Sequence, residues 1–309
     1  MGKVYEALKM AGGSIHEGAP EPSVRGSSRV ARGYVEPEPE AVNYMDYLLN
    51  GIPGLETPAA AEATLLAPIA RPVIDVPRPA AVDIGNVDHR LVAFQGSDRP
   101  ALEQYNRLGM ALISGAAERR LKKILIGSAE RGEGRTTVAL NLACTLARAR
   151  KRVLLIEADL AKPSIARMLG VDADPGLGDI FRWKNPGAAL VSVRRIGFDL
   201  LPTRSRVGNS AEILSSRAFN LAIDLLEPHY DFILFDTPPL LEAADCNLLM
   251  RIADAMVLVI TAGRLKTSQL AKAVGGLRPE DVFGVVLNRS RSASSLGWGI
   301  GRVAQGVSE

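Results

Sequence analysis

The chain has 309 residues, of which 47% are hydrophobic, enough to bury a sizeable core in one or two domains. Its formal net charge of +3 conceals an asymmetry, because residues 12–98 hold twelve acidic and six arginine side chains and leave the remainder basic. No stretch approaches the ~20 apolar residues of a membrane helix, and two cysteines, Cys144 and Cys246, are too few for a disulfide framework. We therefore expect a cytoplasmic protein with both cysteines in its core and no metal site of histidine and cysteine ligands.

The first third of the chain reads as a leader. Residues 1–11 predict a short amphipathic helix. Residues 12–98 contain ten of the nineteen prolines, a density that blocks helices and sheet ladders, so they predict an acidic and largely disordered linker.

From Arg99 the pattern changes to short aliphatic strands that alternate with helices. Helices are expected at 101–115, 136–150, 210–230, 242–253 and 268–277, and strands at 122–129, 153–158, 198–203, 232–236, 255–261 and 282–288. Nearly continuous aliphatic strands between helices indicate an α/β domain, with a mostly parallel sheet covered by helices on both faces. We place this domain at 99–290 and a flexible tail at 291–309. The basic clusters at its helix ends lack interleaved aromatics, so no nucleic acid is expected as a partner.

The stretch SAERGEGRTT at 128–137 joins a buried strand to a helix. In phosphate-binding loops the usual spacing is GxxxxGK followed by Ser or Thr, because backbone N–H groups and the helix N-terminus cradle phosphate oxygens. Here Ala129 is followed by four residues and then Gly134, Arg135 and Thr136. The stretch predicts a phosphate loop with arginine in place of lysine; a glycine turn that merely serves packing is the alternative.

Acidic residues stand at the ends of two other predicted strands. Asp236 ends the strand in DFILFDTPP, and Glu157 and Asp159 follow the aliphatic run in LLIEADLAKPS. A carboxylate in such a place is expensive to bury unless it meets a cation or a donor. Either acid of the second pair alone would suit a helix cap, but three acids beside a phosphate loop indicate a nucleotide site. Asp236 would then hold Mg²⁺, with Thr136 as the other ligand.

The order of SAERGEGRTTVALNLA, VLLIEADLAKPS, GLGDIF, NSAEILSS, DFILFDTPP and GVVLNR resembles the bacterial tyrosine kinases of capsule and exopolysaccharide synthesis. That family is a branch of the MinD/ParA-like P-loop ATPases, and the resemblance spans residues 99–290. It implies a P-loop NTPase fold and transfer of the γ-phosphoryl group of ATP to tyrosine with Mg²⁺. It also implies a membrane polysaccharide co-polymerase or chain-length regulator as activator, recruitment to the inner face of the membrane, and a homo-oligomer.

The resemblance also implies roles for individual residues. The nucleotide-binding residues would be Gly132, Glu133, Gly134, Arg135, Thr136, Thr137, Asn288 and Arg289, with Asn288 at the adenine. The catalytic residues would be Arg135, Glu157, Asp159 and Asp236, and the metal ligands Thr136, Asp159 and Asp236.

The chain departs from the family pattern at four points. Arg135 replaces lysine, and Glu157 replaces an aspartate of the Walker A′ motif. The carboxyl-terminal tail lacks the tyrosine cluster that accepts phosphate, and Arg107 lies one residue away from its place in the ring-forming E-x-x-R-x-x-R helix that starts at Glu103. Because guanidinium is planar and larger than ammonium, activity weakened by orders of magnitude is plausible.

Three functions follow from these features. The first is an ATP-dependent tyrosine autokinase with acceptors in the leader (Tyr34, Tyr44, Tyr47) or on another protein. The second is a nucleotide-responsive scaffold of the same polysaccharide machinery that hydrolyses little ATP. The third is a MinD/ParA-like positioning ATPase, which Glu130 disfavours because such proteins carry a signature lysine at that place.

Overall fold

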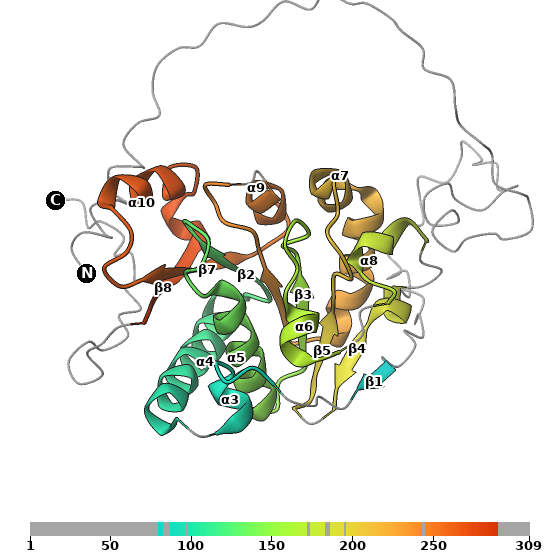
Figure 1. Ribbon diagram of the computed structural model, residues 1–309, viewed down its shortest axis with the longest axis horizontal. Coiled ribbons are helices and arrows are strands. Elements are labelled where there is room, and N and C mark those ends of the chain that lie inside the picture. The colour runs from blue at the N-terminus through green and yellow to red at the C-terminus, as the bar shows by residue number, and fades with distance from the viewer. Residues whose placement is uncertain are drawn as a thin grey trace, which may run out of the picture.

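One β-sheet forms the centre of the molecule (Figure 1). The computed structural model describes residues 80–82, 87–96, 98–171, 174–182, 186–194, 196–242 and 245–289. Within them eight strands pair in the order β1-β4-β5-β3-β6-β2-β7-β8. In that order they span Ala80–Val82, Val191–Val193, Phe198–Leu201, Val153–Glu157, Phe232–Asp236, Lys123–Ser128, Ala255–Thr261 and Val282–Asn288. Every neighbouring pair is parallel except β4 and β5, which confirms the predicted mostly parallel sheet.

Helices cover both faces of this sheet, as expected (Figure 1). One face carries α3 (Val92–Gln95), α4 (Arg99–Arg119), α5 (Arg135–Arg148) and α6 (Ile165–Leu169). The other carries α7 (Ser210–Ser215), α8 (Arg217–Leu226), α9 (Asp245–Met250) and α10 (Thr267–Val274). None of the described helices combines the length and apolar composition that crossing a bilayer requires.

The central strands are apolar along their whole length because they are buried on both sides. In β2, Ile124 and Ile126 pack toward α5, whereas Leu125 packs toward the face that carries α8. Cys144 and Cys246 lie in the core on opposite faces of the sheet and are buried, as their apolar surroundings predicted.

The described residues include two elements inside the segment that the sequence assigned to a disordered linker. Strand β1 pairs with β4 at the sheet edge, and residues 87–96, which include α3, pack on the domain. Leu91 and Ala93 are fully buried, and the ring of Phe94 meets Phe198 edge-on at 6.1 Å between centroids. The expected boundary at Arg99 is therefore too late. The remaining linker, the helix expected at 1–11 and the tail at 291–309 fall outside the described residues.

The helix expected at 210–230 is two helices, α7 and α8. Ser216 adopts extended backbone, with φ −68° and ψ 149°, and its hydroxyl accepts a hydrogen bond from the Phe219 N–H at 3.0 Å. Serine competes for backbone donors in this way at helix starts, so it ends one helix and caps the next. The apolar periodicity runs through the break and therefore hides it.

Candidate nucleotide site

The phosphate loop follows β2 and leads directly into α5. Its two glycines have positive φ, +79° at Gly132 and +95° at Gly134. A Cβ at Gly134 would lie 2.1 Å from Nδ2 of Asn288, so both the backbone conformation and the available space require glycine there. Glycines in these places leave the backbone N–H groups of the loop and of the start of α5 free to meet an anion.

We expect Gly134→Ala to destabilise the protein by about 2–4 kcal/mol and to weaken nucleotide binding, because the alanine must adopt a positive φ and displace Asn288. Thermal unfolding and ADP titration measure both effects. Gly208→Ala is the matched control, since a Cβ at Gly208 meets nothing within 4 Å. Equal stability of the two variants would contradict the account of the loop.

Glu133 and Asn288 brace the loop rather than face the cavity. The Glu133 carboxylate accepts hydrogen bonds from the N–H groups of Glu130 at 2.8 Å and Thr261 at 3.3 Å. Asn288 donates from Nδ2 to the Glu133 carbonyl at 2.8 Å, and its Oδ1 accepts from the N–H of Arg289 at 2.9 Å. Both residues were predicted to contact nucleotide, and both lie at the site, but their polar groups hold the loop to the ends of β7 and β8. Of the predicted pair, Arg289 is the residue that lines the cavity.

Arg135 occupies the lysine place at the first position of α5 and is only 8% exposed. Its Nη1 donates to the Ser128 hydroxyl at 2.9 Å, and its Nη2 donates to Asp159 Oδ2 at 3.4 Å. Its Nε is buried without a partner among the described residues. The guanidinium is thus held from two sides within the loop.

Asp236 ends β6, the strand between β2 and β3. Its Oδ2 accepts a hydrogen bond from the Thr136 hydroxyl at 2.7 Å, whereas its Oδ1 is buried without a partner among the described residues. Burial raises the pKa of Asp236 to about 7, against the opposing effects of Arg135 and of the Thr136 hydrogen bond. An orphaned carboxylate oxygen beside a threonine hydroxyl is the donor set that Mg²⁺ takes next to a phosphate.

Glu157 serves the fold rather than the cavity. Its Oε1 accepts hydrogen bonds from the N–H groups of Ser164 and Ile165, at the start of α6, and its Oε2 accepts from Thr203 N at 3.0 Å. The side chain is fully buried, and burial raises its pKa although these three donors lower it. Glu157 and Asp159 are only two residues apart in the sequence, but their carboxylates have different partners. Glu157 accepts from backbone N–H groups, whereas Asp159 reaches the arginines of the loop.

We expect Glu157→Ala to lower the free energy of unfolding by about 3 kcal/mol, because three backbone donors lose their acceptor. Urea unfolding of the variant measures the loss. The exposed Glu242 provides the control, since Glu242→Ala removes a surface carboxylate whose one ion pair among the described residues is with Arg131. A stable Glu157→Ala variant that lacks activity would contradict the structural role.

Asp159 is the acid of this pair that reaches the loop. Its Oδ2 lies 3.4 Å from Nη1 of Arg131 and 3.4 Å from Nη2 of Arg135, and its Oδ1 accepts from the N–H of Lys162 at 3.1 Å. It is 5% exposed. Two guanidinium groups therefore share one buried carboxylate.

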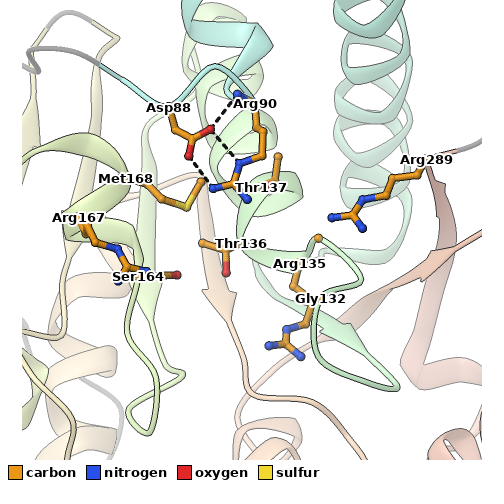
Figure 2. Close-up of a pocket in the computed structure, with 11 residues that line it drawn as sticks. Asp88, Arg90, Gly132, Arg135, Thr136, Thr137, Ser164, Arg167, Met168 and Arg289 are labelled. Atoms are coloured by element: carbon orange, nitrogen blue, oxygen red, sulfur yellow. Dashed lines mark hydrogen bonds and ion pairs between the residues drawn. The ribbon is translucent and has the colours of Figure 1, made fainter. Parts of the chain in front are cut away.

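A cavity of about 540 Å³ lies beside the phosphate loop (Figure 2), and Asp159 and Asp236 are not among the residues that line it. The cavity is lined by residues of the loop and of α5, by α6, by Arg289 after β8, and by a segment that precedes α3. The lining residues are Asp88, Arg90, Gly132, Gly134, Arg135, Thr136, Thr137, Ser164, Arg167, Met168 and Arg289. The sequence reasoning missed Asp88, Arg90, Ser164, Arg167 and Met168. The only signal for the first two was the apolar run LVAF at 91–94, which follows them directly.

Comparison with known proteins finds relatives that are named tyrosine-protein kinases. A family model described as an AAA domain matches residues 121–275. The tyrosine-protein kinase YwqD of Bacillus subtilis is 33% identical over 201 residues, which cover 64% of this chain and 84% of the relative. The putative tyrosine-protein kinase CapB of Staphylococcus aureus is 29% identical over 190 residues, 60% of this chain and 83% of the relative.

Solved structures show the same architecture. The kinase domain of the Escherichia coli tyrosine kinase ETK superposes with a TM-score of 0.62 at 22% identity, over 71% of this chain and 92% of that domain. The VpsO kinase domain superposes with a TM-score of 0.56 at 29% identity, over 64% of this chain and 98% of that domain.

Proposed function

Because the chain belongs to the bacterial tyrosine-protein kinases, we propose that it binds ATP with Mg²⁺ and phosphorylates tyrosine. The observation that carries the proposal is the pairing of Asp236 with Thr136 at the start of the helix that follows the phosphate loop. The second oxygen of Asp236 is buried and unpartnered among the described residues. Such an oxygen costs free energy unless a ligand uses it.

The loop and its neighbours supply the parts that phosphoryl transfer needs. The backbone N–H groups from Gly132 to Thr137 would hold the phosphates. Thr136 and Asp236 would hold Mg²⁺, which neutralises phosphate charge when bound. Asp159 would take the proton from the tyrosine hydroxyl. Its Oδ1 accepts a backbone N–H, but its Oδ2 contacts only the guanidinium groups of Arg131 and Arg135 among the described residues. The tyrosine oxygen then bonds to the γ-phosphorus, the bond to the β-phosphate oxygen breaks, and ADP leaves.

We propose an acceptor tyrosine outside the described domain. Tyr230 is buried, and its hydroxyl donates to Asp199 at 2.8 Å. Burial of Tyr105 raises its pKa to about 12. Tyrosines of the leader, such as Tyr44, or tyrosines of another protein are the proposed acceptors. Tyr34 and Tyr47, like Tyr44, lie outside the described residues.

The proposed partner is a membrane polysaccharide co-polymerase. It would recruit this chain from the cytoplasm to the inner membrane face and activate it in exopolysaccharide or capsule export.

A nucleotide-responsive scaffold of the same machinery is the second candidate. The observation in its favour is the engagement of Arg135, which bonds to Ser128 and Asp159 and so occupies the residue that would act as base. Such a protein would bind ATP or ADP and transfer little phosphate.

Incubation of the full chain with labelled ATP and Mg²⁺ tests both candidates. The reaction is run alone and with the cytoplasmic segment of a polysaccharide co-polymerase, and phosphotyrosine is measured. Phosphotyrosine in either reaction supports the kinase. Nucleotide binding without phosphotyrosine in both supports the scaffold, and absence of nucleotide binding contradicts both.

A further inference from the structure

Residues 87–96, here called the strap, run along α5 next to the cavity. Asn141, which is fully buried on α5, holds the strap at two points. Its Oδ1 accepts from the N–H of Ala93 at 2.8 Å, and its Nδ2 donates to the carbonyl of Arg90 at 3.1 Å. Asn141 also donates to the carbonyl of Thr137 at 2.9 Å. Thr137 ends the loop stretch, and Asn141 follows it by one helical turn. The backbone of the strap is therefore tied to the helix that the loop begins.

The strap also reaches the opposite wall of the cavity. The N–H of Asp88 donates to the carbonyl of Met168, in α6, at 3.4 Å. Figure 2 shows Asp88 and Arg90 across the cavity from Gly132, with Thr136 between them. The strap thus bridges α5 and α6 on the side that faces the phosphate loop.

Within the strap, Asp88 holds the Arg90 guanidinium in one plane. Nε of Arg90 donates to Oδ1 at 2.8 Å and Nη2 donates to Oδ2 at 2.5 Å, while the Arg90 N–H donates to Oδ1 at 2.9 Å. The Arg90 side chain is 51% exposed, and its Nη1 has no partner among the described residues. A fork fixed on one edge presents its remaining donors at little cost in conformational entropy.

The charge of the cavity suits a polyanion. Arg90, Arg135, Arg167 and Arg289 all line it. Among the described lining residues the one acid is Asp88, and Arg90 already engages both of its oxygens. Arg90 pairs with Asp88 and Arg135 pairs with Asp159, which leaves Arg167 and Arg289 as the lining cations that have no ion pair among the described residues.

We propose that Arg90 is a nucleotide-binding residue, whose guanidinium contacts the phosphate chain of ATP or ADP from the side opposite the phosphate loop. The inference rests on the proposed function, because it assumes that a nucleotide occupies this cavity. Since Asn141 and Met168 fix the strap to the two flanking helices, a nucleotide held by Arg90 also stabilises the docked strap. By reciprocity, docking of the strap favours nucleotide binding to the same degree.

Calorimetric titration of the full chain with ADP, before and after Arg90→Ala, tests the proposal. We expect a loss of about tenfold or more in ADP affinity, the effect of one charge-assisted hydrogen bond. Arg152→Ala is the matched control. Arg152 forms a similar exposed pair with Asp231, at 2.7 and 3.4 Å, but at the start of β3, away from the cavity, and its side chain is 60% exposed. Its ADP affinity is expected to equal that of the wild type.

Amide exchange of the strap separates direct contact from a general loss of folding. In the wild type, ADP is expected to slow exchange of the buried Ala93 amide. In Arg90→Ala, exchange without ADP is expected to match the wild type, because Asn141 binds backbone groups, and ADP is expected to add little protection. Arg90→Lys, which retains the charge but not the fork, is expected to fall between the two.

Three results would overturn the proposal in distinguishable ways. Equal ADP affinity in Arg90→Ala and wild type would remove Arg90 from the nucleotide site while leaving the proposed function intact. A loss confined to binding of O-phosphotyrosine, with ADP affinity unchanged, would assign the guanidinium to a phosphorylated product instead. A wild-type chain that binds no ADP would contradict the proposed function itself.

Discussion

Replacement of Asp236 by asparagine is expected to abolish phosphotyrosine formation and to stabilise the nucleotide-free protein above neutral pH. Asparagine keeps an oxygen that accepts from the Thr136 hydroxyl, so the local geometry survives. It lacks the negative charge with which the second oxygen would bind Mg²⁺, and loss of such electrostatic positioning lowers the rate by about 100-fold or more. Phosphotyrosine detection after incubation with labelled ATP measures this effect.

The gain in stability follows from the pKa of Asp236. Burial raises that pKa from the ordinary 3.8 to about 7 in the folded protein, so the folded state holds the proton at pH values where the unfolded state has lost it. The contribution of Asp236 to stability is therefore fully present below pH 3.8, is lost progressively as the pH rises toward 7, and is absent above that. The loss is on the order of 4 kcal/mol. Asparagine does not ionise, so its urea midpoint is expected to change less between pH 5 and pH 8.

The matched comparison is made with Mg²⁺ and ADP present. Mg²⁺ bound together with ADP favours the ionised carboxylate, so the two ligands together are expected to stabilise the wild type more than Asp236→Asn. A variant that retains kinase activity would show that Asp236 is not a metal ligand. A wild-type unfolding midpoint independent of pH between 5 and 8 would show that the carboxylate stays ionised throughout.

The sheet and the phosphate loop could be predicted because their signals are local. Runs such as ILIG at 124–127 and FILF at 232–235 are apolar without alternation, which only strands buried on both faces tolerate. Gly134, Thr136 and Asp236 carry a chemical reason for their places, and the structure brings all three to the carboxyl ends of β2 and β6. The carboxyl ends of parallel strands meet at one edge of the sheet. A residue that follows such a strand can therefore be placed at this edge without knowledge of any distant contact.

The contacts of Glu157 and the position of Arg90 could not be predicted because residues distant in the sequence decide them. The sequence pattern of a carboxylate at a strand end is the same whether its side chain faces a ligand or backbone N–H groups. Glu157 accepts from backbone N–H groups, those of Ile165 and Thr203 among them. Arg90 stands in a proline-rich, acidic segment whose composition indicates disorder. Its place at the cavity depends on Asn141, 51 residues later, and on the packing of Phe94 against Phe198. No local pattern connects these residues.

Replacement of Arg135 by lysine is expected to raise the rate of tyrosine phosphorylation about tenfold or more. Arginine is held between Ser128 and Asp159, and these two contacts fix the orientation of its planar fork in the loop. Lysine carries the same charge on a compact, freely rotating ammonium that reaches a phosphate oxygen as a point charge. It also releases one of the two guanidinium groups that engage Asp159, so that carboxylate is better able to accept the tyrosine proton.

Arg131→Lys separates these two causes. Arg131 lies at the same 3.4 Å from Asp159 Oδ2 but precedes the loop glycines, so its replacement loosens the carboxylate without changing the cation at the start of α5. A gain in Arg135→Lys alone assigns the effect to contact with phosphate, and an equal gain in both variants assigns it to the freed Asp159. A fall in activity on Arg135→Lys would instead identify the guanidinium as the working cation of this site, because the loop would then be adapted to arginine rather than impaired by it.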